Sequence, residues 1–171
     1  GMKTGGNTIT LHEGIEHASI YMDVINFRHS DKIQLILKTE VDDTSVYIPQ
    51  FILQPLMENA VVHAFGDASS GYQICIHSYS CQKDLHILVS DNGRGMTDEE
   101  LHGLLTSLEG EASPDESIGL INVNQRIRLF YGNDYGLHIA SRPGKGTQIK
   151  ILLPFRDHSE NMTDITGGTD T

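Results

Sequence analysis

The sequence predicts an α+β fold, a two-layer α/β sandwich in which helices pack on one face of a mixed β-sheet. Apolar residues recur at three- and four-residue steps in some segments and alternate with polar residues in others. The first pattern is typical of a helix with one buried face, and the second of a strand. Helices and strands are interleaved along the chain, which argues against stacked sheets, and hairpins argue against a wholly parallel sheet.

The first third of the chain predicts a long helix, a strand and a second helix. Apolar residues at helical spacing predict the first helix over residues 11–29, and alternation predicts a strand over residues 33–41. The second helix is expected to begin near Pro49, because a proline in the first turn gives up an N–H that has no partner there. Pro55 is then expected to kink this helix or to split off a short first turn.

The rest of the chain predicts two hairpins and two helices. The expected elements are strands at 72–79 and 84–89, helices at 98–108 and 119–131, and strands at 137–141 and 147–153. Thr97 or Asp98 is expected to cap the first of these helices. Residues 109–117 are polar and without apolar periodicity, so they are expected to form a mobile loop placed to cover a ligand.

Composition indicates one globular domain, expected over residues 8–156 of the 171. Residues 1–7 are small and polar and are expected to be loose, and Gly1 before Met2 is typical of a cloning remnant. The polar residues 157–171 are expected to be disordered. The formal net charge of −11 argues against a general nucleic-acid binder, which needs a basic surface. Cys75 and Cys81 make no metal pattern and are expected to be reduced thiols. No apolar run approaches the roughly 20 residues of a membrane helix.

The run Asp91-Asn92-Gly93-Arg94-Gly95-Met96 stands at the end of a predicted strand. Glycine lets a ligand approach the main chain closely. A carboxylate beside such a turn can accept a hydrogen bond from the exocyclic amine of adenine, where guanine has a carbonyl. The pattern is weak by itself, because many tight turns look like it.

Three further runs strengthen the pattern because they occur in a fixed order with it. They are Gln54-Pro55-Leu56-Met57-Glu58-Asn59-Ala60, Ser117-Ile118-Gly119-Leu120, and Gly144-Lys145-Gly146-Thr147. With these runs, residues 11–155 resemble the ATP-binding domain of the superfamily that joins histidine kinases, gyrase, a heat-shock chaperone and the mismatch-repair ATPases. The resemblance is closest to the LytS-like sensor histidine kinases, and it implies a two-layer sandwich that holds ATP between helices and a lid.

The resemblance assigns roles around the adenine. Asp91 is expected to accept from the adenine amine, and Thr147 to support that contact directly or through water. Gly93 and Gly95 are expected to let the backbone pass close to the base, and Met96 to contact the nucleotide.

The resemblance also assigns roles around the phosphates. Asn59 is expected to offer its amide oxygen to Mg²⁺ and, with His63, to serve catalysis. Gly119 and Leu120, at the start of a helix, are expected to present backbone N–H groups to the phosphates.

Two positions depart from the family pattern, and one argues against hydrolysis. The family usually has lysine where Val62 stands and often glycine where Ser117 stands, which bears on catalytic rate more than on binding. The branches that hydrolyse ATP have a glutamate one turn before the metal-binding asparagine, and Pro55 occupies that position. Glu58 points about 100° away from Asn59 around the helix, so a role as base is not favoured.

The expected function is therefore that of the catalytic domain of a two-component sensor histidine kinase. It would bind Mg-ATP and pass the γ-phosphoryl group to a histidine on a dimerisation domain, whose acceptor motif is absent from this sequence. A cognate response regulator is the expected partner, and the parent is expected to be a membrane-anchored homodimer with this domain in the cytoplasm. A nucleotide-gated interaction module with decayed catalysis and an anti-sigma-type serine kinase remain alternatives.

Overall fold

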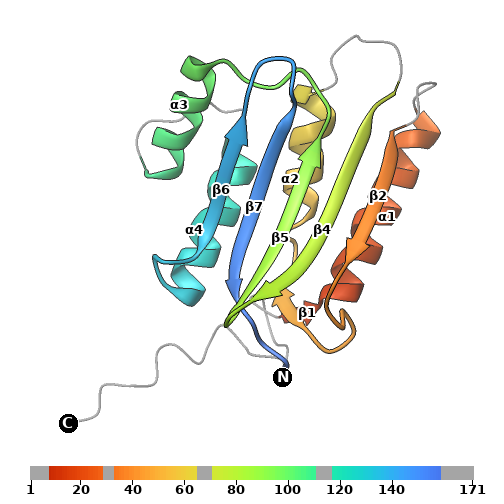
Figure 1. Ribbon diagram of the computed structural model, residues 1–171, viewed down its shortest axis with the longest axis vertical. Helices are drawn as coiled ribbons and strands as arrows, with labels where there is room; N and C mark the ends of the chain where they lie inside the picture. The colour runs from red at the N-terminus through yellow and green to blue at the C-terminus, as the bar shows by residue number, and fades with distance from the viewer. Residues whose placement is uncertain (1–7, 29–32, 65–70, 111–116, 159–171) are drawn as a thin grey trace, which may run out of the picture.

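The computed structural model describes residues 8–28, 33–64, 71–110 and 117–158, and a five-stranded mixed sheet is its main feature (Figure 1). In chain order the elements are β1 (Thr8–Thr10), α1 (Leu11–Arg28), β2 (Gln34–Thr39), β3 (Tyr47–Pro49), α2 (Gln54–Asn59), the π-helix η1 (Ala60–Ala64), β4 (Gln73–Cys81), β5 (Asp84–Asp91), α3 (Asp98–Leu108), α4 (Ile118–Tyr131), β6 (Gly136–Ser141) and β7 (Thr147–Pro154).

The strand order of the sheet is β2-β4-β5-β7-β6, with β2 parallel to β4 and every other pair antiparallel. The central strand β5 alternates as the sequence predicts: Leu85, Ile87 and Val89 are buried, while the residues between them are partly exposed. The sheet therefore has one face in the core and one face toward solvent.

Helices α1, α2 and α4 all lie behind the sheet in Figure 1, so they cover the same face. Their apolar faces enter one core, to which α1 contributes Ile15 and Met22, and α4 contributes Val123 and Ile127. The predicted two-layer α+β architecture is confirmed. The helices at 98–108 and 119–131 and both hairpins also form close to the predicted bounds.

The prediction of a helix from Pro49 is wrong. Tyr47–Pro49 is strand β3, which pairs antiparallel with β1 in a separate two-stranded sheet. Helix α2 begins only at Gln54, so Pro55 lies in its first turn and neither kinks nor splits it. The start of the helix was predicted too early because β3 is only three residues long and its partner, β1, lies far away in the sequence.

Several expectations concern residues outside the described part of the chain. They are the loose start at 1–7, most of the polar loop (residues 111–116) and most of the polar tail (residues 159–171). The two cysteines are free thiols, as expected. Among the described residues, no helix is long and apolar enough to span a membrane.

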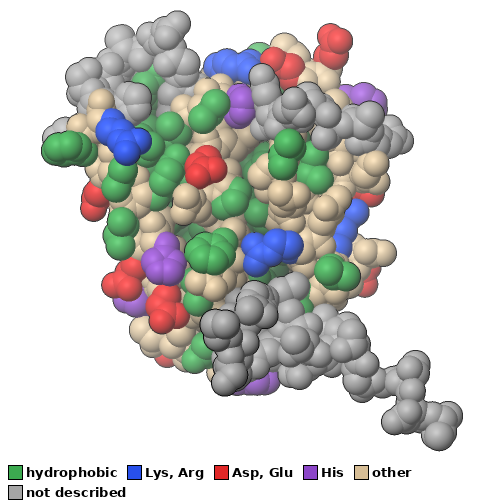
Figure 2. Space-filling model, turned by 180° about the vertical axis from the view of Figure 1, so that it is seen from behind, with side chains coloured by type: hydrophobic (Ala, Val, Ile, Leu, Met, Phe, Trp, Pro, Cys, Tyr) green, Lys and Arg blue, Asp and Glu red, His purple; other side chains and the backbone are tan. Residues whose placement is uncertain are grey.

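An apolar groove lies on the helical side of the molecule, between α1 and the segment that joins β3 to α2. Its volume is about 350 Å³, and its walls include Ile20, Val24 and Phe51. These three side chains are 61%, 45% and 62% exposed. Figure 2, which views this side, shows hydrophobic side chains gathered on the surface.

Candidate functional site

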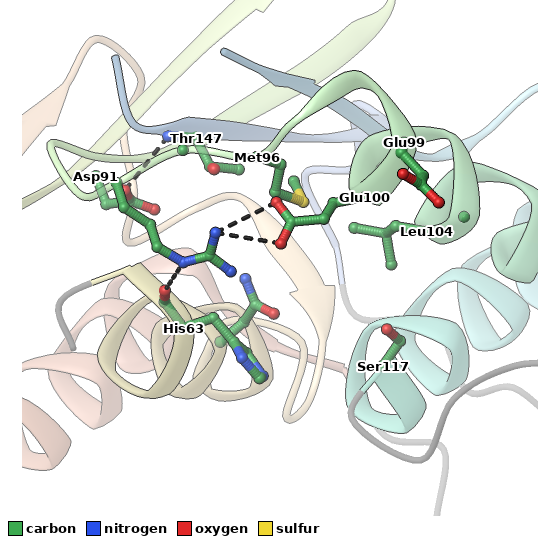
Figure 3. Close-up of a pocket in the computed structure, with 12 residues that line it drawn as sticks. His63, Asp91, Met96, Glu99, Glu100, Leu104, Ser117 and Thr147 are labelled. Atoms are coloured by element: carbon green, nitrogen blue, oxygen red, sulfur yellow. Dashed lines mark hydrogen bonds and ion pairs between the residues drawn. The ribbon is translucent and has the colours of Figure 1, made fainter. Parts of the chain in front are cut away.

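A cavity of about 360 Å³ lies between the end of α2–η1, the turn after β5, helix α3 and the start of α4 (Figure 3). It is lined by Asn59, His63, Asp91, Arg94, Gly95, Met96, Glu99, Glu100, Gly103, Leu104, Ser117 and Thr147. A volume of this size is typical of small-molecule sites. The structure thus brings together residues that the sequence analysis selected from four separate motifs.

A second cavity of about 300 Å³ adjoins the first. Asn59 and His63 line both cavities, while Gly119 and Leu120 of α4 line only the second. The predicted residues therefore lie around two cavities that share Asn59 and His63, with Asp91 on the first and Gly119 and Leu120 of α4 on the second. Gly93 lies buried inside the turn and lines neither cavity.

Asp91 closes one end of the site from the last position of β5. Its Oδ1 accepts from the backbone N–H of Gly93 at 2.8 Å and of Thr147 at 3.3 Å. Among the described residues, Oδ2 has no hydrogen-bond partner, so an acceptor remains for a ligand donor. Burial raises the pKa of Asp91 above its ordinary value, and the two N–H donors partly oppose that rise.

The turn after β5 is shaped by the β6–β7 hairpin. Gly95 has φ +68°, and a Cβ there would lie 1.9 Å from the carbonyl oxygen of Arg142. Gly146 has φ +75°, and a Cβ there would lie 2.0 Å from the carbonyl oxygen of Asp91. Both glycines are therefore required by contact between the two turns, whether or not a base approaches them.

Asn59 and His63 reach the site from the junction between α2 and the π-helix η1. Single π-turns within helices are frequent at functional sites. Val62 is 66% exposed and lines the second cavity, so the position where the family pattern has lysine does face the site. Glu58 also lines this cavity, and its Oε1 accepts from Gln54 Nε2 at 3.1 Å.

Arg94 links three parts of the site in a way that the sequence analysis missed. Its Nε donates to the carbonyl oxygen of His63 at 3.1 Å, and its Nη1 reaches Glu100 at 3.2 and 3.3 Å (Figure 3). Glu100 also completes the capping box that Thr97 forms at the start of α3. The arginine therefore holds the turn after β5 against both η1 and α3.

Two other polar residues, Asn92 in the turn after β5 and Arg126 in α4, have structural roles. Asn92 accepts from Gln73 N–H at 2.7 Å and donates to the Gly71 carbonyl at 2.7 Å, which fixes the start of β4. Arg126 donates to the carbonyl of Gln50 at 2.7 Å, beneath the segment that leads into α2. Burial lowers the pKa of Arg126.

The start of α4 forms the other end of the site. Ser117 is the N-cap residue, and its side chain makes no capping hydrogen bond. Helix N-terminal N–H groups are donors for anions, in line with the roles expected of Gly119 and Leu120. Gly119 packs on Pro55, whose Cβ would lie 3.5 Å from an added Cβ.

The donor set fits a magnesium ion held mainly by its nucleotide. The described residues contain no group of three or more His, Cys, Asp or Glu side chains arranged to bind a metal. Mg²⁺ usually takes one or two protein oxygen ligands and completes its shell with phosphates and water. The Asn59 amide oxygen, between the two cavities, suits that role.

Taken together, a two-layer α+β fold and a site with a carboxylate at one end and a helix start at the other indicate a nucleotide-binding domain. Residues 43–157 match the family described as "Histidine kinase-, DNA gyrase B-, and HSP90-like ATPase", and the chain belongs to this family. Membership implies ATP as the ligand.

Known relatives identify the histidine-kinase branch. The chain is 30% identical over 154 residues to the sensor protein kinase HptS of Staphylococcus aureus strain USA300, and the match spans 90% of this chain and 29% of that protein. The predicted histidine-kinase ATP-binding domain is thereby confirmed.

Solved structures agree on the fold. The histidine kinase domain of the Erythrobacter litoralis EL346 blue-light activated kinase aligns with a TM-score of 0.61 at 18% identity, over 90% of this chain and 65% of that one. The catalytic domain of histidine kinase ThkA aligns with a TM-score of 0.62 at 16% identity, over 86% and 94%.

Proposed function

We propose that this chain is the catalytic domain of a sensor histidine kinase that binds Mg-ATP and donates the γ-phosphoryl group to a histidine on a separate dimerisation domain. The observation that carries the proposal is the pair of cavities that share Asn59 and His63 and extend from Asp91 to the start of α4. It offers a hydrogen-bond acceptor for adenine at one end and backbone N–H donors for phosphates at the other.

The adenine end would select its ligand by hydrogen-bond polarity. Asp91 Oδ2 accepts from the exocyclic amine, and Thr147 holds the carboxylate through its backbone N–H. Met96 and Leu104 supply apolar wall for the ring. Guanine would place its carbonyl against the carboxylate, and this repulsion would disfavour it.

The phosphate end would hold the charged part of the nucleotide. Gly119 and Leu120 present N–H groups in the first turn of α4, and the helix dipole adds to the attraction. Asn59 provides the protein oxygen for Mg²⁺, which neutralises charge on the transferring phosphoryl group. His63, beside Asn59 in both cavities, is placed to contact the phosphates.

Transfer to an acceptor, rather than hydrolysis, is supported by the residues next to Asn59. Pro55 lies in the first turn of α2 and lines the second cavity, which we call the phosphate-side cavity. A proline side chain cannot act as a base toward water. Glu58 lies in the same cavity but is hydrogen-bonded to Gln54. A kinase that lacks a water-activating base hydrolyses little ATP, so the γ-phosphoryl group remains available for transfer to the acceptor histidine.

The partners follow from the same proposal. The acceptor is the parent's own dimerisation domain, the downstream partner is a cognate response regulator, and the parent is a membrane-anchored homodimer with this domain in the cytoplasm. The chain spans only 29% of its sensor-kinase relative, which leaves room for such segments there. The apolar groove is where we expect the parent's dimerisation domain to dock, because its walls expose Ile20, Val24 and Phe51, and exposed apolar patches mark interaction surfaces.

The test is calorimetric titration with Mg-ATP and Mg-GTP, using an Asp91→Asn variant. The wild type is expected to prefer ATP. The amide that replaces the Asp91 carboxylate would turn a donor toward the adenine amine, so we expect ATP affinity to fall about tenfold to a hundredfold. The matched control is Asp98→Asn, at an exposed position of α3, which should bind ATP like the wild type. Absence of ATP binding by the wild type, or equal binding by the Asp91→Asn variant, would overturn the proposal.

A further inference from the structure

The hydroxyl group of Ser141, the last residue of β6, lies at the meeting point of the two turns that build the adenine end. Its Oγ is 2.8 Å from the backbone nitrogen of Met96, 3.0 Å from the carbonyl oxygen of Gly146 and 2.8 Å from Oγ1 of Thr147. A serine hydroxyl has one proton to donate and two lone pairs with which to accept. These three contacts use that capacity completely.

The two backbone contacts fix the direction of the third. The Met96 N–H can only donate, so Ser141 Oγ accepts from it. The Gly146 carbonyl can only accept, so it takes the Ser141 proton. The remaining lone pair of Ser141 must then accept the proton of the Thr147 hydroxyl, and this is the one arrangement that satisfies all three groups.

The Thr147 hydroxyl therefore donates its proton to Ser141 Oγ, within the protein. Thr147 lines the cavity beside Asp91, and its backbone N–H donates to Asp91 Oδ1 at 3.3 Å. The Thr147 hydroxyl keeps only lone pairs for a ligand, and Asp91 Oδ2, in the lining of the same cavity, offers lone pairs as well. The site thus presents two acceptors, which match the two N–H bonds of an exocyclic amine, either directly or through a water that donates to Thr147.

We propose that Ser141 is a specificity-determining positioning residue that makes the Thr147 hydroxyl an obligatory acceptor and thereby strengthens selection of 6-aminopurine over 6-oxopurine nucleotides. This inference rests on the proposed function, because it concerns the same nucleotide site. Without the Ser141 hydroxyl, Thr147 is free to rotate its proton toward the cavity. It can then donate to a 6-oxo group, and discrimination against that group is weakened.

The experiment compares Mg-ATP with Mg-ITP, since inosine differs from adenosine by the 6-oxo group and the N1 proton that accompanies it. Dissociation constants are measured by calorimetry for the wild type, Ser141→Ala and Ser141→Thr. We expect the ATP-over-ITP ratio of Ser141→Ala to fall about tenfold, the value of one hydrogen bond, while Ser141→Thr keeps the wild-type ratio. Ser80→Ala, at an exposed serine of β4, is the matched control and should leave the ratio unchanged.

The route through Thr147 is tested by a double-mutant cycle. Thr147→Val should itself lower the ATP-over-ITP ratio, and Ser141→Ala should change nothing further in the Thr147→Val background. Should Ser141→Ala fail to fold, Ser141→Cys tests the same expectation, because a thiol is a poor hydrogen-bonding substitute.

A purely structural role for Ser141 would weaken ATP and ITP binding equally and leave the ratio intact, and that result overturns the inference. If the wild type prefers ATP but Ser141→Ala has the same ATP-over-ITP ratio as the wild type, the inference falls while the proposed function stands. If the wild type binds neither nucleotide, both fall.

Discussion

His86 is a single residue whose titration should be visible in the stability of the domain. It lies on β5, on the sheet face opposite the core, with its ring stacked on Tyr79 at a centroid distance of 4.9 Å. Its Nδ1 is buried and has no hydrogen-bond partner among the described residues. Burial first, and Lys150 second, lower the pKa of His86, so the folded protein favours the neutral ring.

We therefore expect stability to fall as the solution becomes acidic. A histidine whose pKa is lowered by folding contributes fully above its unfolded pKa of about 6.5, and its contribution is lost as the pH falls from there toward the folded value. Urea denaturation at several pH values should show this decline as the pH falls below about 6.5. His86→Gln should make the slope shallower, while His138, whose pKa burial also lowers, contributes in the same direction. An unchanged slope would contradict this account of His86.

At the scale of elements, the adenine end depends on the contact between the turn after β5 and the β6–β7 hairpin. Gly144 N–H donates to the Arg94 carbonyl at 2.7 Å, and Met96 N–H donates to Ser141. Gly95 and Gly146 permit the close approach of the two backbones. The hairpin is thus part of the candidate site, although only Thr147 was predicted from it as a site residue.

A side chain at Gly95 should separate these two turns. We expect Gly95→Ala to lower the free energy of unfolding by roughly 3 kcal/mol, because the left-handed backbone and the contact with the Arg142 carbonyl both oppose a Cβ. The matched control is Gly103→Ala in α3, where an added Cβ meets no atom within 4 Å. Because alanine has a higher helix propensity than glycine, Gly103→Ala should stabilise the protein by up to about 1 kcal/mol. Equal stability of the two variants in urea denaturation would refute the packing argument.

Local patterns were sufficient for most elements. Helix α3 forms at 98–108 with Thr97 as its cap, as predicted, because its signals lie within a few residues of one another. Strand β3 was missed because its ladder partner is β1, which lies before the whole of helix α1, and no local pattern encodes that pairing.

At the scale of the whole molecule, we expect the chain to bind Mg-ATP without phosphorylating itself. The acceptor motif is absent from the sequence, and Pro55 leaves no base for water at its position in the phosphate-side cavity. Incubation with γ-labelled ATP should give little or no label on the chain. Addition of the parent's dimerisation domain in trans is the positive control, and label appearing at a kinase-like rate on the isolated chain would contradict the expectation.

The sequence alone determined the fold class, the family and most of the predicted residues that line the two cavities, because periodicity and ordered motifs are local properties of the chain. Tertiary structure alone decided that Gly95 and Gly146 serve contact between two turns, that Arg94 joins the turn after β5 to η1 and α3, and that Ser141 orients Thr147. Each of these depends on atoms brought together from distant parts of the chain. Hydrogen-bond direction and steric exclusion act over a few ångströms in space, and spacing along the sequence does not report them.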